Sequence, residues 1–149
     1  MSKRILIMGL PGSGKTTLAS KLSVRLSPDC LWLNADVIRE RYDDWDFSLS
    51  GRIRQAERMR ELAGDTDKDY IICDFIAPSK QMRDIFKPDL IIWMNTVTES
   101  RFADTDKIFE APVGLNVLEI QNRDSFYWSD FIIKNLPYLI YYSIMNHKS

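Results

Sequence analysis

The chain has 149 residues, of which 45% are hydrophobic and 28% charged, as is typical of one globular domain with a full core. Its formal net charge of −1 excludes a global positive field, so we expect no long nucleic acid and no membrane as partner, and any anion site must be local. The single histidine, His147, excludes a His-based catalytic triad and a multi-histidine metal site.

The chain carries no sequence signal for a membrane or for export. No apolar run approaches the ~18 residues that span a bilayer, and the short run after Lys3 and Arg4 is broken by glycines. Cys30 and Cys73 both lie in apolar runs, which predicts inert buried thiols in a reducing compartment. We therefore expect a cytoplasmic protein.

The first half of the chain alternates strand and helix patterns. Short continuous apolar runs predict buried strands, and leucines at four-residue steps (Leu18, Leu22 and Leu26) predict a helix. The predicted elements are a strand at 5–8, a helix at 15–26, a strand at 30–33, a short helix at 36–42 and a charged helix at 48–63 that Gly64 stops.

The second half continues this order less regularly. It predicts strands at 70–73, 90–94 and 113–120, a helix after Pro78, a flexible lid at 95–112 with little periodicity, and a tail at 124–149 of one or two helices interrupted at Pro137. The tail is expected to pack on the outside of the sheet. Its aromatic residues could stack on bases, but core packing is favoured for Phe126, Tyr127, Trp128 and Phe131.

Strands that alternate with helices indicate an α/β fold. The expected architecture has three layers, with a parallel sheet of about five strands flanked by helices. We see no linker, so residues 1–149 are predicted to form a single domain.

A glycine-rich motif follows the first predicted strand. Residues 9–16 read GLPGSGKT and fit the pattern G-x-x-x-x-G-K-[ST], between a strand and a helix. Backbone N–H groups of such a loop converge on phosphate oxygens, and the helix points its positive end at them. Lys15 would reach the β and γ phosphates, the Thr16 hydroxyl would complete a Mg²⁺ shell, and Thr17 would face the nucleotide or cap locally. The predicted ATP-binding residues are Gly9, Leu10, Pro11, Gly12, Ser13, Gly14, Lys15, Thr16 and Thr17.

Asp36 and Arg39 follow the second predicted strand. Ligands of parallel sheets gather at the carboxyl ends of strands, so both side chains should face the crevice of the phosphate loop. Asp36 could accept the proton of an attacking hydroxyl or hold water on Mg²⁺, and Arg39 could neutralise an anionic acceptor. The alternative is that Asp36 only caps the helix.

Charged residues further along offer weaker candidates. Asp74 ends an apolar strand, where an acid often binds the metal through water, although it could equally be a loop or capping residue. Lys80 and Arg83 share one helical face and could clamp a phosphate or be solvated. A third set, Arg52, Gln55 and Arg58, also lies roughly on one face and could bind an anion.

The chain resembles the adenylylsulfate kinase family of P-loop kinases. The resemblance covers roughly residues 4–112 and is carried by GLPGSGKTT, NADVIR, DFS at 46–48, the helix of Arg52, DFIAPSKQMRD and FEAP at 109–112. It implies a parallel sheet between helices, a lid, and transfer of the γ-phosphoryl of ATP to the 3′-hydroxyl of adenylylsulfate with Mg²⁺, a step of sulfate assimilation.

The resemblance also implies residue roles on the acceptor side. Asp36 would be the acid next to the acceptor hydroxyl, Arg39 and Arg52 would bind the acceptor, and Phe47 would stack on its adenine. Gln55 replaces an asparagine of the family. The backbone of Phe75, Ile76 and Ala77 would line the acceptor site, with Lys80 nearby.

The chain departs from the family at three further places. Asn34 stands where the family usually has another aspartate, and Asp74 where it usually has a small hydroxyl residue. The lid is shorter than the family's, and its second stacking phenylalanine and its lysines have no clear match. Substitutes would come from Arg101, Lys107, Phe102 or Phe109.

The sequence thus predicts an ATP- and Mg²⁺-dependent kinase of a small anionic hydroxyl acceptor. Alternatives are a nucleotide kinase, a polynucleotide 5′-hydroxyl kinase, and a degenerate kinase that acts as a nucleotide-binding switch. A homodimer is left open.

Overall fold

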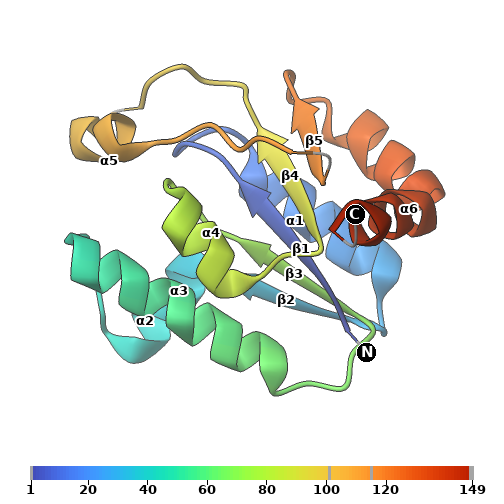
Figure 1. Ribbon diagram of the computed structural model, residues 1–149, viewed down its shortest axis with the longest axis horizontal. Coiled ribbons are helices and arrows are strands. Elements are labelled where there is room, and N and C mark those ends of the chain that lie inside the picture. Colours follow the sequence, from blue (N-terminus) through green and yellow to red (C-terminus); the bar gives the residue numbers. More distant parts are fainter. Residues whose placement is uncertain (1, 101, 115, 148–149) are drawn as a thin grey trace.

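The computed structural model describes residues 2–100, 102–114 and 116–147 and has a central sheet with helices on both sides (Figure 1). Its elements, in chain order, are β1 (Lys3–Met8), α1 (Lys15–Leu26), β2 (Cys30–Asn34), α2 (Ala35–Tyr42), α3 (Leu49–Gly64), β3 (Tyr70–Asp74), α4 (Lys80–Phe86), β4 (Leu90–Met94), α5 (Ala103–Ile108), β5 (Val117–Ile120) and α6 (Ser125–His147).

The sheet has five strands in the order β2-β3-β1-β4-β5, and each neighbouring pair is parallel. β1 is central, and its Ile5 stands in register with Ile72 on one side and Leu90 on the other. The carboxyl ends of parallel strands lie at the same edge, so the loops after all five strands meet there. The predicted parallel sheet of about five strands is confirmed.

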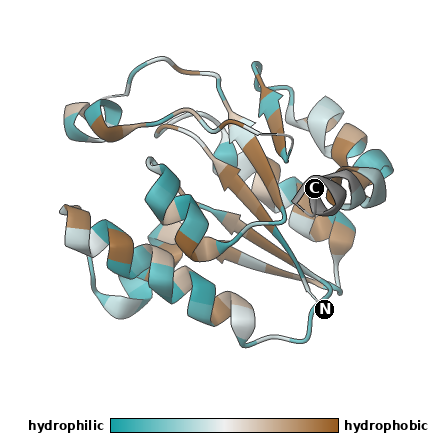
Figure 2. Ribbon diagram, in the orientation of Figure 1, coloured by the Kyte–Doolittle hydropathy of each residue, from teal (hydrophilic) through white to brown (hydrophobic). Residues whose placement is uncertain are grey.

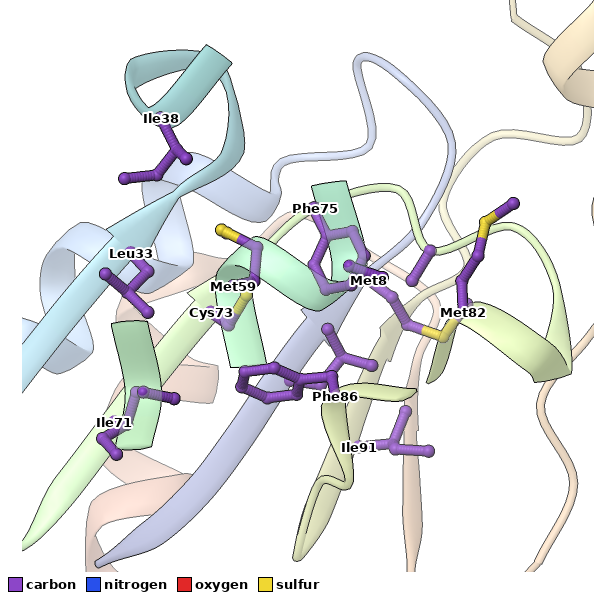
Figure 3. Close-up of a cluster of buried hydrophobic side chains, with 14 residues drawn as sticks. Met8, Leu33, Ile38, Met59, Ile71, Cys73, Phe75, Met82, Phe86 and Ile91 are labelled. Carbon is purple, nitrogen blue, oxygen red and sulfur yellow. The ribbon is translucent and has the colours of Figure 1, made fainter. Parts of the chain in front are cut away.

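Two hydrophobic clusters hold the helices to the two faces of the sheet. Successive strand residues point to opposite faces. On one face Leu6 and Met8 pack with α3 and α4, and Figure 3 shows Met8, Phe75 and Phe86 gathered there. On the other face Ile5 and Ile7 pack with α1 and α6. The strands are therefore apolar over most of their length (Figure 2), and the three-layer prediction is confirmed.

Two predicted elements differ in extent. The 95–112 segment, expected to be irregular, contains helix α5. This helix has only six residues, which is too short to give a periodic pattern in the sequence. Its start is fixed locally, because the Asp106 carboxylate accepts hydrogen bonds from the Ser100 N–H and hydroxyl. The last strand, expected at 113–120, is only Val117–Ile120, the part in register with β4.

The C-terminal segment also differs from the prediction. α6 runs through Pro137 without interruption. Pro137 lies on the exposed side of the helix, where water can satisfy the carbonyl that loses its donor. Core packing was wrong for Phe126 and Tyr127, which are 77% and 56% exposed, because only one side of α6 faces the sheet.

The two cysteines are free, and burial raises the pKa of both thiols. Cys73 is fully buried, whereas Cys30 is half-buried with its pKa raised to about 11. Their protonated state agrees with inert thiols.

Within the described residues, no helix is both long enough and apolar enough to cross a bilayer.

Candidate active site

The loop between β1 and α1 has the conformation that its glycines allow. Gly9, Gly12 and Gly14 all have positive φ angles, of 153°, 81° and 101°. At Gly9 a side chain is also excluded by space, since an added Cβ would lie 2.7 Å from the backbone oxygen of Met94. The Ser13 carbonyl accepts a hydrogen bond from Thr96 (2.7 Å), which ties the loop to the end of β4.

The N-terminus of α1 is arranged for an anion. Its cap residue is Gly14, which has no side chain to bind the first N–H groups, and its first turn has no acidic residue. These N–H groups and the helix dipole therefore favour a negative ligand. Lys15 leans across the loop, and its Nζ donates to the Leu10 carbonyl at 3.0 Å.

Lys15 is a partly desolvated cation. Burial lowers its pKa to about 8, against the opposing effect of the nearby carboxylates Asp74 and Asp36. A triphosphate bound beside Lys15 would add negative charge that stabilises the protonated form of this side chain.

Asp74, at the end of β3, is 3% exposed and held by three donors. Its carboxylate accepts hydrogen bonds from Thr16 Oγ1 (3.2 Å), Trp32 Nε1 (2.6 Å) and Asn34 Nδ2 (3.1 Å). Burial raises the pKa of Asp74, and these hydrogen bonds oppose the rise. Asn34 and Asp74 are register partners on neighbouring strands, so the Asn34 amide lies beside the Asp74 carboxylate.

Asp36 is not the cap of α2. The cap is Asn34, whose Oδ1 accepts from the Val37 N–H at 3.0 Å, and Asp36 lies in the first helical turn. Its exposed side chain lines the same cavity as Lys15, Thr16 and Asp74. The capping alternative is therefore wrong, and the carboxylate is available to a ligand.

A cavity of about 1190 Å³ contains the phosphate loop and most of the predicted acceptor residues. Its lining comes from the ends of several strands and from the lid, a geometry typical of α/β ligand sites. The predicted residues that line it are Pro11, Gly12, Gly14, Lys15, Thr16, Thr17, Asp36, Arg39, Phe47, Arg52, Gln55, Asp74, Phe75, Ile76 and Ala77.

Arg39 and Arg52 lie around Phe47, in the part of the cavity that is predicted to bind the acceptor. The Arg39 guanidinium lies 4.3 Å from the centre of the Phe47 ring and donates to the carbonyls of Asp44 and Asp46. Arg52 donates to the Phe47 carbonyl (2.8 Å). These bonds hold residues 43–48, the rim loop, and use only part of each guanidinium's donors.

The lid is joined to this region by Arg52. Arg52 Nη2 donates to Thr105 Oγ1 on α5 at 2.9 Å, and this bond is buried. Arg52 therefore contacts both the rim loop and the lid. Figure 1 shows α5 on the side of the molecule toward which the strands' carboxyl ends point.

Gln55 and Arg83 donate hydrogen bonds to backbone carbonyls of neighbouring segments. Gln55 Nε2 donates to the Ala35 carbonyl at 3.1 Å. Arg83 is buried and donates to the carbonyl of Ala77, which has the left-handed φ of 44°. Arg83 thus supports the loop after β3, which is predicted to line the acceptor site, and is neither a solvated residue nor a phosphate clamp in this structure.

Two predicted anion ligands lie elsewhere. Lys80 is exposed and pairs with Asp84 at 2.6 Å, and it does not line the cavity, because its place at the start of α4 points it to solvent. Arg58 pairs with Asp44 and so stabilises the rim loop. Lys107 and Phe109 line a smaller neighbouring groove, and Arg101 lies outside the described residues.

Several residues that line the cavity were not predicted from the sequence. Trp45 adds an exposed aromatic ring to the cavity rim, and Arg123, after β5, donates to the Gly12 carbonyl at 3.0 Å. Phe102, which was predicted as a substitute for the second stacking phenylalanine, also lines the cavity with an exposed ring. Trp45 stands two residues from the predicted Phe47, so its place in the sequence could have indicated it as a further lining residue. Nothing local in the sequence marks Arg123.

Gly51 provides a test of the rim loop. A Cβ at Gly51 would overlap the backbone oxygen of Asp46, so Gly51→Ala must displace the loop. We expect a loss of ~1–3 kcal/mol in the free energy of unfolding and weaker acceptor binding, measured by denaturant titration and acceptor KM. Gly64→Ala, in the same helix with its nearest neighbour 3.9 Å away, is the control. Equal effects of the two variants would contradict the expectation.

The donor set fits a magnesium ion held together with a nucleotide. Among the residues that the structure describes, no group of three or more His, Cys, Asp or Glu side chains could hold a metal alone. Mg²⁺ is usually bound by one or two protein oxygens, waters and substrate phosphates. Thr16 Oγ1 and Asp74 Oδ1, which lie 3.2 Å apart beside the phosphate loop, provide such oxygens, and Asp36 lines the same cavity.

Comparison with solved structures shows the same fold in kinases. The APS kinase CysC of Mycobacterium tuberculosis, in complex with AMPPNP and APS, shares 17% identity with a TM-score of 0.71, over 91% of this chain and 98% of that chain. A sugar kinase from Janibacter sp. HTCC2649 shares 16% identity with a TM-score of 0.71, over 92% and 95%. A gluconokinase from Sinorhizobium meliloti 1021 shares 13% identity with a TM-score of 0.63, over 91% and 96%.

Comparison with families is more specific. No curated protein matches the chain significantly. The family model of adenylylsulphate kinase matches residues 1–98, which include the phosphate loop, the carboxylates of Asp36 and Asp74, and the rim loop. Because this match covers more than half of the chain, the chain belongs to the adenylylsulphate kinase family of P-loop kinases.

Proposed function

We propose that the protein transfers the γ-phosphoryl group of ATP to a hydroxyl of a small anionic acceptor, most specifically the 3′-hydroxyl of adenylylsulfate. The observation that carries the proposal is one cavity in which Lys15, Thr16 and Asp36 face the acceptor-side residues Arg39 and Arg52. A kinase needs both halves in one enclosed site, since phosphoryl transfer depends on positioning and charge stabilisation.

The nucleotide half consists of the phosphate loop and Lys15. The N–H groups of the loop and of the first turn of α1 would bind the β and γ phosphates, and Lys15 would neutralise charge on the transferred group. Thr16 and Asp74, with Asp36 in the same cavity, would hold Mg²⁺, which would supply Lewis-acid stabilisation of the phosphate charge. The CysC complex with AMPPNP and APS supports this nucleotide assignment.

Asp36 would act on the acceptor hydroxyl. As the acceptor oxygen forms its bond to the γ-phosphorus, the bond to the β–γ bridging oxygen breaks and ADP leaves. The carboxylate of Asp36 would orient the hydroxyl and accept its proton. Its exposed position in the first turn of α2, free of the capping role, supports this assignment.

The acceptor side favours a molecule with an anionic group and a planar ring. Arg39 and Arg52 provide positive charge, and the half-exposed rings of Trp45 (50%), Phe47 (48%) and Phe102 (47%) line the rim. Rings of this kind stack on a nucleobase. A sugar acceptor, as the sugar kinase and gluconokinase neighbours would suggest, has no planar aromatic ring to stack on these side chains.

An acceptor screen tests the proposal. Labelled ATP with Mg²⁺ would be incubated with adenylylsulfate, nucleoside monophosphates, 5′-hydroxyl oligonucleotides, gluconate and simple alcohols, and the products identified by mass spectrometry. Adenylylsulfate is expected to give the fastest transfer. Transfer to another acceptor alone would reject adenylylsulfate, and tight ATP binding without any transfer would favour a nucleotide-binding switch.

The pH dependence of nucleotide affinity tests Lys15. As the pH rises from about 7 to about 9, it passes the lowered pKa of Lys15, about 8, and the free protein loses the cation that faces the triphosphate. MgATP affinity, measured by calorimetry, should therefore fall over this range. Lys15→Met should remove most of this slope. A flat profile for the wild-type protein would contradict the role of Lys15.

A further inference from the structure

Trp32 lies in β2, far from the phosphate loop in the sequence, yet its side chain reaches the site. It is two residues before Asn34, so both side chains point to the same face of the sheet, the one covered by α1. There its Nε1 donates to Asp74 Oδ2 at 2.6 Å. This is the shortest of the hydrogen bonds that hold the Asp74 carboxylate.

The donors around Asp74 fix both carboxylate oxygens. Asn34 Nδ2 lies 3.1 Å from each oxygen, and Thr16 Oγ1 donates to Oδ1 at 3.2 Å. Trp32 donates only to Oδ2, the oxygen that Thr16 does not bind. The carboxylate therefore cannot rotate without loss of the indole bond, and Oδ1 stays directed at the Thr16 hydroxyl.

We propose that Trp32 is a positioning residue for the metal of the nucleotide complex, and that it acts by fixing the carboxylate of Asp74 beside Thr16. The inference rests on the proposed function in one respect, the binding of ATP together with a divalent cation. Residues that orient a metal-binding carboxylate typically change metal affinity ~10–100-fold when they are replaced.

A purely structural role is the alternative. Trp32 packs against the hydrophobic cluster between the sheet and α1, so its replacement could act on stability alone. Trp32→Phe keeps most of this packing and removes the indole N–H. Trp93→Phe is the matched control, because Trp93 is also half-buried on a strand of the sheet but packs on Phe109, away from Asp74.

Metal occupancy would be measured without reliance on turnover. Electron paramagnetic resonance of Mn²⁺ gives the Mn²⁺ concentration at which half of the protein–ATP complex holds metal, and calorimetry gives ATP affinity with Mg²⁺ and with EDTA. Trp32→Phe should raise the half-saturating Mn²⁺ concentration ~10-fold or more and leave ATP affinity in EDTA unchanged. Trp93→Phe should change neither quantity.

A double-mutant cycle with Asp74→Asn tests whether Trp32 acts through Asp74. In the Asp74→Asn background, Trp32→Phe should cause no further loss of Mn²⁺ affinity. Additive losses would overturn the inference, and so would unchanged Mn²⁺ affinity in Trp32→Phe alone. Either result leaves the proposed function intact, whereas absence of ATP binding by the wild-type protein would overturn both.

Discussion

Asp36→Asn is expected to lower turnover ~10²- to 10⁴-fold while MgATP still binds. The amide has the same shape as the carboxylate but cannot accept the proton of the acceptor hydroxyl. The capping hydrogen bond of α2 comes from Asn34, so the fold of this helix does not depend on the Asp36 carboxylate. Steady-state kinetics with the acceptor found in the screen gives turnover, and calorimetry gives nucleotide affinity.

Glu40→Gln is the control for this variant. Glu40 is an exposed carboxylate of the same helix and does not line the cavity. The control should keep wild-type turnover. Wild-type turnover in Asp36→Asn would remove Asp36 from the chemistry and would leave the phosphate loop assignment unaffected.

Lys15→Met should have the largest effect on the nucleotide half of the site. It removes the cation beside Asp74 and Asp36, so a triphosphate would meet two carboxylates without compensation. We expect weaker MgATP binding and a loss of ~10²- to 10³-fold in turnover, since removal of one charge-stabilising donor costs about this much. Calorimetry and single-turnover kinetics separate the two quantities.

Lys21→Met, in the same helix, is the matched control. The Lys21 ammonium lies 4.3 Å from the centre of the Phe126 ring, and Lys21 does not line the cavity. Its removal should leave MgATP affinity unchanged, and melting temperatures of both variants show whether the fold is retained. A Lys15→Met protein that binds MgATP like the wild type would be incompatible with the proposed nucleotide site.

Local patterns predicted those parts of the molecule that depend on neighbouring residues in the chain. The phosphate loop is contiguous, and its glycines stand at the positions where the backbone needs a positive φ angle. The strands are short apolar runs buried on both faces, and α1 and α3 have regular periodicity. The order of elements, the parallel sheet and the position of Asp36 at its edge all follow from these patterns.

The capping residue of α2 and the structure of the lid were harder to predict from the sequence. Asn34 and Asp36 are both good capping residues, and the choice between them depends on where β2 ends. That point is set by pairing with β3, in which Asn34 stands opposite Asp74. Helix α5 is too short for a periodic signal, and its Thr105 hydroxyl is bound by a guanidinium from α3.

The sequence by itself therefore determined the fold class, the phosphate loop and the candidate carboxylates. Only the tertiary structure decided which basic side chains line the cavity. Arg39 and Arg52 line it, whereas Arg83 supports a backbone turn and Lys80 faces solvent. The tertiary structure also brought Trp32 to Asp74 and Arg123 to the phosphate loop. The physical reason is that a charged side chain's role depends on its partners, and packing brings these partners from distant parts of the chain.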